Sequence, residues 1–151
     1  MTVMRPAERQ DAAALAELCA ACVHQPWSEL SFLSEMDKGS LVLTAWEDER
    51  LVGFAVTEML DEVAYLHLIG VDTDYRRKGL GKQMLTECEA QSASRGAERM
   101  MLEVRESNQK AREFYLSLGY EILARRRDFY SFPREDGLTM QKVITDENTC
   151  N

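Results

Sequence analysis

A chain of 151 residues, of which 45% are hydrophobic and 29% charged, can bury one substantial core, which argues against disorder and against a second domain. No stretch approaches the roughly 20 apolar residues of a membrane span, and the first residues lack a secretory signal, so a cytoplasmic protein without membrane contact is expected. The formal net charge of −8 disfavours direct nucleic-acid binding, because phosphate-binding surfaces are normally basic, and it suits a basic partner.

The first half of the chain is expected to hold two helices and four strands. Leu15 and Leu18 recur at helical spacing, Ser28 can cap the second helix, and Gly39 can close it. Gly70 indicates a bulge or a close backbone approach within a strand whose apolar character is typical of a central position. The expected elements are a short strand over 3–5, helices over 12–23 and 28–38, a hairpin of strands over 41–46 and 51–59, and a strand over 64–71.

The second half alternates helices and strands. Leu80 and Met84 belong to an apolar face typical of an amphipathic helix, which Gly96 ends. Ser107 or Asn108 can cap a shorter helix. The expected elements are helices over 79–94 and 108–118, strands over 99–104, 120–130 and 138–144, and a polar tail over 146–151.

This order of elements predicts an α/β (α+β) sandwich, in which a mixed, mainly antiparallel central sheet is flanked by helices on both faces. The strand-helix-strand-helix-strand order of the second half requires at least one parallel pair near the middle of the sheet. Residues 1–145 are expected to form a single domain, and residues 146–151 a flexible tail.

The cysteines give little sign of a metal centre. Cys19-Ala-Ala-Cys22, followed by His24, places three possible zinc ligands close together. No second cysteine pair completes a tetrahedral set, although Cys88 and Cys150 are also present. Reduced thiols packed as small apolar side chains are the favoured interpretation, and no metal cofactor is expected.

A basic, glycine-containing segment separates the strand that ends near Val71 from the helix that begins near Gly79. A helix N-terminus carries unpaired amide donors and about half a positive charge, and both attract phosphate. Glycine at positions 79 and 81 removes the side chains that would keep a diphosphate from those amides. Glycine pairs are more often simple turns, so the segment alone leaves a phosphate site and a plain turn equally open. The segment is Asp74-Tyr75-Arg76-Arg77-Lys78-Gly79-Leu80-Gly81-Lys82.

Two commoner phosphate-binding motifs are excluded by their spacing. A P-loop requires glycine where Arg76 stands and serine or threonine where Gln83 stands. A dinucleotide-binding fingerprint that starts at Gly79 requires glycine or alanine where Met84 stands. The segment fits neither motif.

Instead, Arg76-x-x-Gly79-x-Gly81 after a strand resembles the acyl-CoA pyrophosphate motif of the GNAT N-acetyltransferases. The resemblance extends over nearly the whole chain. It implies the GNAT fold and an enzyme that acylates an amine with acetyl-CoA as co-substrate. The other segments that carry it are Met4-Arg5-Pro6-Ala7 with Asp11, Ile69-Gly70-Val71-Asp72 as the bulged strand, Leu102-Glu103-Val104-Arg105 with Asn108, and Phe114-Tyr115-x-x-x-Gly119-Tyr120.

Within this superfamily, the chain is most similar to the enzymes that acetylate the N-terminal alanine of a ribosomal protein. Those enzymes usually have alanine where Gly70 stands and two tyrosines where Phe129-Tyr130 stands. Both departures concern the peptide side more than the cofactor site. The segments that carry this similarity are Pro26-Trp27-Ser28, Glu103-Val104-Arg105 with Ser107-Asn108, and Arg134-Glu135-Asp136.

The resemblance implies which residues hold acetyl-CoA. Backbone groups of the strand before the basic segment would hold the thioester and the pantetheine arm, where strand pairing is interrupted. Asn108 would contact the same arm, and its alternative role is to cap a helix. The implied cofactor-binding residues are Ile69, Gly70, Val71, Arg76, Arg77, Lys78, Gly79, Leu80, Gly81, Lys82 and Asn108.

The resemblance assigns the proton transfers to Glu103 and Tyr115. Acetyl transfer needs a neutral amine, a polarised carbonyl and a proton for the departing thiolate. Glu103 would take the proton of the amine, and Tyr115 would protonate the thiolate. Independently, Glu103 interrupts an apolar strand, where partial burial would make it a stronger base, although an ordinary polar-face residue is the alternative. Tyr115 could equally be a core residue.

The acceptor side is less defined. An N-terminal α-amine has a pKa of about 7.7–8.0, against about 10.4 for lysine, so a modest base acting through water suffices for the former. Trp27 could line a peptide groove or anchor a helix. Acidic residues could steer a basic peptide or serve only solubility, and they are Glu35, Asp61, Glu62, Glu135 and Asp136.

Three hypotheses follow. The leading one is a monomeric N-terminal alanine acetyltransferase whose peptide substrate is the N-terminus of a small-subunit ribosomal protein. The second is an enzyme of the same fold that acetylates lysine side chains, other protein N-termini or a small amine. The third is a non-catalytic acyl-CoA-binding module, which the presence of both Glu103 and Tyr115 disfavours.

Overall fold

The computed structural model of the protein describes residues 1–145, and the predicted tail over 146–151 lies outside the described residues. The elements lie close to their predicted bounds. They are β1 (Thr2–Pro6), η1 (Arg9–Asp11), α1 (Ala12–Cys22), α2 (Glu29–Asp37), β2 (Leu41–Glu47), β3 (Arg50–Leu60), β4 (Val63–Val71), η2 (Thr73–Tyr75), α3 (Leu80–Ser94), β5 (Arg99–Arg105), α4 (Gln109–Ser117), β6 (Glu121–Ser131) and β7 (Arg134–Val143).

Local signals set most helix ends. The Ser28 hydroxyl accepts a hydrogen bond from the Ser31 amide at 3.2 Å and begins α2, as predicted. Gly39 follows α2 with a φ of 87°, a conformation that favours glycine. β7 begins four residues earlier than predicted, at Arg134, because it pairs with the end of β6 in a hairpin.

The seven strands form one sheet in the order β1-β2-β3-β4-β5-β7-β6. Neighbouring strands are antiparallel except β4 and β5, which are parallel. The predicted fold class, a mainly antiparallel sheet with a parallel pair near its middle, is therefore confirmed.

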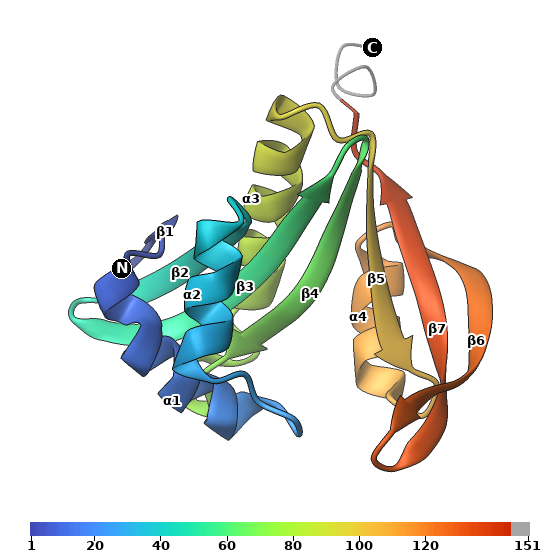
Figure 1. Ribbon diagram of the computed structural model, residues 1–151, viewed down its shortest axis with the longest axis horizontal. Coiled ribbons are helices and arrows are strands. Elements are labelled where there is room, and N and C mark those ends of the chain that lie inside the picture. The colour runs from blue at the N-terminus through green and yellow to red at the C-terminus, as the bar shows by residue number, and fades with distance from the viewer. Residues whose placement is uncertain (146–151) are drawn as a thin grey trace.

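The parallel pair is short. Only Val63–Tyr65 of β4 lies opposite Arg99–Met101 of β5. Beyond these residues the two strands diverge toward their C-terminal ends, as Figure 1 shows. β4 stays paired with β3, and β5 stays paired with β7, so the sheet opens along a single line between two well-supported halves.

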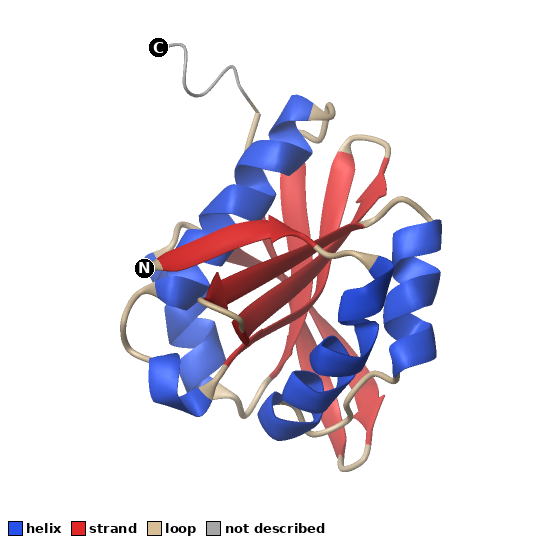
Figure 2. Cartoon of the chain, turned by 90° about the vertical axis from the view of Figure 1, so that its left-hand side faces the viewer, coloured by secondary structure: helices blue, strands red, loops and turns tan. Residues whose placement is uncertain are grey.

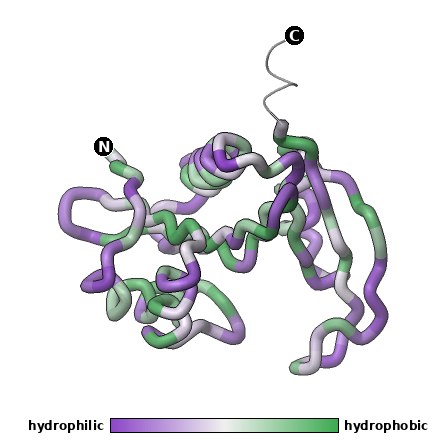
Figure 3. Tube along the Cα trace, turned by 45° about the horizontal axis from the view of Figure 1, so that its top comes forward, coloured by the Kyte–Doolittle hydropathy of each residue, from purple (hydrophilic) through white to green (hydrophobic). Residues whose placement is uncertain are grey.

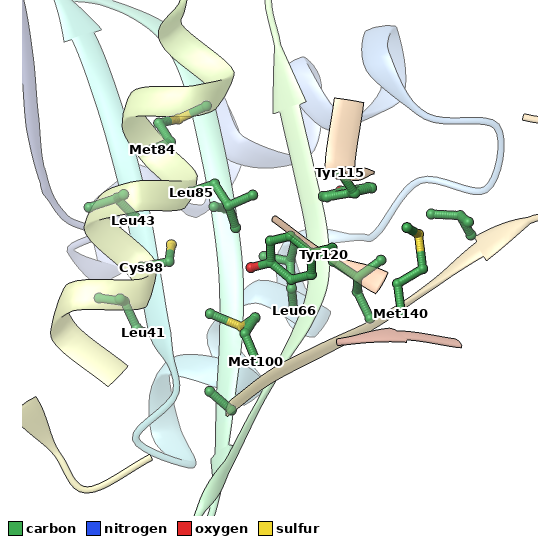
Figure 4. Packing of buried hydrophobic residues seen from close by; sticks show 14 of the residues in the cluster. Leu41, Leu43, Leu66, Met84, Leu85, Cys88, Met100, Tyr115, Tyr120 and Met140 are labelled. Atoms are coloured by element: carbon green, nitrogen blue, oxygen red, sulfur yellow. The ribbon is translucent and has the colours of Figure 1, made fainter. Parts of the chain in front are cut away.

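Helices cover both faces of the sheet, as Figure 2 shows. α1 and α2 pack on one face of β2, β3 and β4, and α3 packs on the other. Alternate residues of a strand serve the two faces: in β2, Leu43 belongs to the core beneath α3, and Val42 belongs to the core beneath α1 and α2. Figure 4 shows Met84 and Leu85 of α3 over that first core, which continues to Tyr115 of α4.

Hydropathy follows the same division between interior and rim. Figure 3 shows hydrophobic segments gathered in the central strands, whereas hydrophilic segments dominate the turns. β6, at the edge of the sheet, is exposed along almost its whole length. None of the described helices combines the length and the apolar character that crossing a membrane requires.

Gly70 is explained by a close approach, and the predicted bulge lies elsewhere. Val56 and Thr57 of β3 pair with Leu68 and Leu66 of β4, which leaves His67 as the extra residue of the bulge. A Cβ atom at Gly70 would lie 2.5 Å from Cζ of Phe54, a fully buried ring. The bulge is therefore three residues before Gly70, and Gly70 makes room for an aromatic side chain from the neighbouring strand.

We expect Gly70→Ala to lower the free energy of unfolding by about 1–3 kcal/mol, because the added methyl group overpacks a core ring that cannot move into solvent. Denaturant unfolding of the ligand-free protein measures this loss. Gly81→Ala is the matched control, since its Cβ would meet nothing closer than 3.5 Å. Equal stability of the two variants would contradict the explanation.

Candidate active site

A cavity of about 470 Å³ opens where β4 ends and α3 begins. It collects most of the predicted cofactor-binding residues, while Cys22, Tyr75 and Phe114 complete its wall. The predicted residues that line it are Ile69, Gly70, Val71, Arg76, Arg77, Gly79, Leu80, Gly81 and Lys82.

The N-terminus of α3 presents free amides to this cavity. The first helical hydrogen bond runs from the Gln83 amide to the Gly79 carbonyl at 3.0 Å, so the amides of Leu80, Gly81 and Lys82 have no acceptor within the helix. Arg77 and Gly79 both have positive φ, at 64° and 81°, which curls the turn that carries these amides. The arrangement is suited to bind a phosphate or diphosphate.

Lys78 is the predicted basic residue that lies outside this cavity, and its Nζ lies 5.3 Å from the centre of the Tyr75 ring. Arg76 lines the cavity, and its Nε donates to the Val71 carbonyl at 2.9 Å, which fastens the turn to the end of β4. Positive charge at the cavity therefore comes from Arg76, Arg77, Lys82 and the helix N-terminus.

Within residues 1–145, no neighbouring atom requires position 81 to be glycine. A Cβ atom there would meet Cζ of Phe114 at 3.5 Å, an ordinary contact. Glycine in a helix is disfavoured relative to alanine by about 1 kcal/mol. What the missing side chain provides is open backbone on the cavity wall, which is what a bulky phosphate group needs.

A second cavity, of about 600 Å³, lies where β4 and β5 have diverged. Glu103 of β5 and Tyr115 of α4 both line it, so the two predicted proton-transfer residues are brought together. The two cavities share Cys22 and Ile69, and they are therefore adjacent. A group that enters from the first cavity can reach the side chains of the second.

The Glu103 carboxylate is buried and fully engaged. Its side chain is 6% exposed. The Tyr65 hydroxyl donates to Oε1 at 2.8 Å, the Thr139 hydroxyl donates to Oε2 at 2.5 Å, and a guanidinium nitrogen of Arg126 lies 3.6 Å from Oε1. These donors contact both carboxylate oxygens and hold the carboxylate in one orientation.

Tyr115 is 6% exposed and carries no charge at neutral pH. Burial raises the pKa of its hydroxyl, and the nearby Tyr130 raises it further. Within residues 1–145 that hydroxyl makes no hydrogen bond, so its proton is available to a group in the second cavity.

Asn108 lies in the second cavity and apart from the first. Its side-chain oxygen accepts a hydrogen bond from the Ala111 amide at 3.1 Å and caps α4. The capping role considered from the sequence is therefore present. The side-chain NH2 group is the part of Asn108 that remains for a ligand.

Two of the acidic residues considered for steering a peptide are engaged inside the protein. Glu135 accepts hydrogen bonds from the Ser107 amide at 2.6 Å and from Arg105 at 3.3 Å, which lowers the pKa of its carboxyl. Asp136 forms an ion pair with Arg125 at 2.8 Å. These acids fix the β6–β7 hairpin, which leaves them little charge to offer a partner.

Several site residues were not predicted from the sequence. Tyr65, Thr139 and Cys22 carry no local signal, because their place in the site arises from contacts between separate elements. Cys22 donates a hydrogen bond to the Val71 carbonyl at 3.5 Å instead of pairing with Cys19, which is buried in the core. Trp27 lines the second cavity, in agreement with one of its two predicted roles.

An anion-binding helix N-terminus next to a buried carboxylate and a protonated tyrosine defines a class of protein. The arrangement suits a transferase that moves a group from a phosphate-bearing carrier to an acceptor. The divergence of β4 and β5 brings the first and second cavities together.

Comparison with known proteins identifies the family. The profile of the acetyltransferase (GNAT) family matches residues 9–120. The chain therefore belongs to the GNAT acetyltransferase family and is an acyltransferase, which confirms the resemblance seen in its motifs. This family uses acetyl-CoA.

Close relatives share both sequence and fold. Ribosomal protein bS18-alanine N-acetyltransferase of Salmonella typhimurium is 36% identical over 122 residues, which cover 80% of this chain and 82% of the relative. The crystal structure of the corresponding Escherichia coli enzyme superposes with a TM-score of 0.88 at 32% identity, covering 96% of this chain and 95% of that one. An N-acetyltransferase of Thermoplasma acidophilum, solved in complex with coenzyme A, shares the fold with a TM-score of 0.79 at 21% identity, covering 95% and 99%.

We expect Asn108→Ala to cost about 1 kcal/mol of unfolding free energy, because the Ala111 amide loses its capping acceptor. Asn108→Asp retains a capping oxygen and should keep most of that stability. Denaturant midpoints of the two variants, measured without ligand, provide the comparison. If both variants lost the same stability, the cap would not be the reason.

Proposed function

We propose that this protein is an acetyl-CoA-dependent Nα-acetyltransferase that acetylates the N-terminal alanine of ribosomal protein bS18, the substrate that its relatives are named for. The observation that carries the proposal is the adjacency of two cavities, one with an anion-binding helix N-terminus and one with Glu103 and Tyr115. A ribosomal-protein substrate would place the enzyme in the cytoplasm.

The turn between β4 and α3 supports the binding of acetyl-CoA, the carrier of the acetyl group. The amides of Leu80, Gly81 and Lys82 would hold the diphosphate, with Arg77 adding charge. When bound, acetyl-CoA supplies an activated thioester as the acyl donor. Ile69 and Gly70 lie on the β4 edge that β5 leaves unpaired, so their backbone groups would hold the arm of the carrier.

The acceptor side is supported by the second cavity. Glu103 would accept the proton that the amine releases as its nitrogen bonds to the acetyl carbon, directly or through one water. Tyr115 would donate its proton to the sulfur as the carbon–sulfur bond breaks, and its raised pKa keeps that proton in place until then. No covalent bond to the protein is required, so Cys22 would only line the cavity and would not act as a nucleophile.

An α-amine suits this pair better than a lysine. With a pKa of about 7.7–8.0, an α-amine is already partly neutral at physiological pH, whereas lysine at about 10.4 is almost fully charged. An α-amine therefore requires less of the base than a lysine side chain does.

The proposal is tested with two peptides that carry the N-terminal sequence of bS18, one with a free α-amine and one with that amine blocked. Intact-mass analysis after incubation with acetyl-CoA should show one added acetyl group on the free peptide and none on the blocked one. Turnover of the blocked peptide would identify a lysine acetyltransferase. Binding of acetyl-CoA without any transfer would identify a non-catalytic module.

We expect Glu103→Gln to lower kcat/KM for the peptide by about 100-fold, because the amide cannot accept the proton of the amine. Acetyl-CoA affinity should stay the same, since Glu103 does not line the first cavity. Glu89→Gln is the matched control: Glu89 is also a poorly exposed carboxylate with a tyrosine donor, Tyr120, but it lies outside both cavities. Similar activity of the two variants would overturn the role given to Glu103.

We expect Gly81→Ala to weaken acetyl-CoA binding by about tenfold, equivalent to about 1.4 kcal/mol, because the new methyl group enters the space proposed for the diphosphate. Calorimetric titration measures this affinity. The variant should fold at least as stably as the wild type and recover normal kcat at saturating acetyl-CoA. Unchanged affinity would reject the turn as the carrier site.

A further inference from the structure

We propose that Tyr65 and Thr139 are positioning residues for acetyl transfer, which hold the Glu103 carboxylate in one orientation, aimed into the second cavity. This inference rests on the proposed function of Glu103. It goes further by naming the side chains that place Glu103 for proton transfer.

Three strands bring these side chains together at the line where the sheet opens. Tyr65 is the last residue of β4 that pairs with β5, opposite Met101, two residues before Glu103. Thr139 of β7 pairs directly with Glu103 in the antiparallel β5–β7 ladder. Backbone pairing on both sides of β5 therefore fixes where the two hydroxyls stand relative to the carboxylate.

The two hydroxyls serve different oxygens. Tyr65 donates to Oε1 at 2.8 Å and Thr139 to Oε2 at 2.5 Å, so rotation of the carboxylate would break both bonds. A glutamate side chain that is not already fixed in this way loses rotamer freedom when a substrate orders it. The sheet supplies that order before any substrate arrives, which is the condition for efficient proton transfer.

Both donors keep their protons. Thr139 is 5% exposed and does not ionise, and burial together with Glu103 raises the pKa of Tyr65. At any physiological pH the carboxylate therefore faces two O–H groups and the Arg126 guanidinium. These three interactions hold the carboxylate in place from both of its oxygens.

The test is Tyr65→Phe, which keeps the ring and its stacking on His67 at 4.9 Å but removes the donor. We expect kcat for the N-terminal peptide to fall about tenfold while KM for acetyl-CoA stays the same. The KM for the peptide should change little, since the variant leaves the walls of the cavity in place.

Tyr120→Phe is the matched control. Tyr120 donates to the Glu89 carboxylate at 2.7 Å, so the variant loses the same kind of bond, and neither residue lines either cavity. The kcat of this control should stay that of the wild type. Thr139→Val should behave like Tyr65→Phe, and Thr139→Ser, which restores the hydroxyl, should regain most of the lost kcat.

A double-mutant cycle decides the inference. In a Glu103→Gln background, Tyr65→Phe should cause no further loss, since the residue acts through Glu103. A second tenfold loss in that background, or an unchanged kcat in Tyr65→Phe alone, would overturn the inference and leave the proposed function intact. Full activity of Glu103→Gln would instead overturn the function of Glu103, and this inference with it.

Discussion

The parallel pairing of β4 with β5 stops after Tyr65, and every feature of the site depends on that stop. If the pairing continued, the backbone groups of β4 at Ile69–Val71 would form hydrogen bonds with β5. No space would then separate Glu103 from the side of the sheet that α1 and α2 cover. Because β4 and β5 diverge, Ile69–Val71 lack the hydrogen bonds that β5 would otherwise provide. The cost is bearable because β3 and β7 support the two strands from their other sides.

The opening also explains why the N-terminus of α3 lies at the candidate site. α3 begins where β4 ends, at the open side of the sheet, so its free amides face the same space as the unpaired β4 edge. Gly70 and Gly81 serve this region for different reasons. At position 70 a side chain would clash with the Phe54 ring in the core. At position 81 no neighbour among the described residues excludes a side chain, and glycine leaves the backbone open.

The sequence predicted what depends on consecutive residues. Helix and strand bounds follow from local periodicity and from caps such as Ser28. The turn that precedes α3 follows from the neighbouring Arg77, Gly79 and Gly81. It could not predict what depends on pairing. The bulge at His67 is defined by the partner strand, and the early start of β7 by the hairpin with β6. Likewise, Tyr65 and Thr139 reach Glu103 from 38 and 36 residues away along the chain.

The fate of the charged residues shows why residue type alone misleads. Arg76 belongs to the carrier motif, yet its side chain fastens the turn to Val71. Glu135 and Glu103 are both surrounded by donors, but those of Glu135 tie together the hairpin and a loop, whereas those of Glu103 leave it facing a cavity that also holds Tyr115. A carboxylate becomes a candidate base when the fold fixes it and still leaves one side open to a substrate. In this protein the line of divergence between β4 and β5 provides both conditions at the same residue.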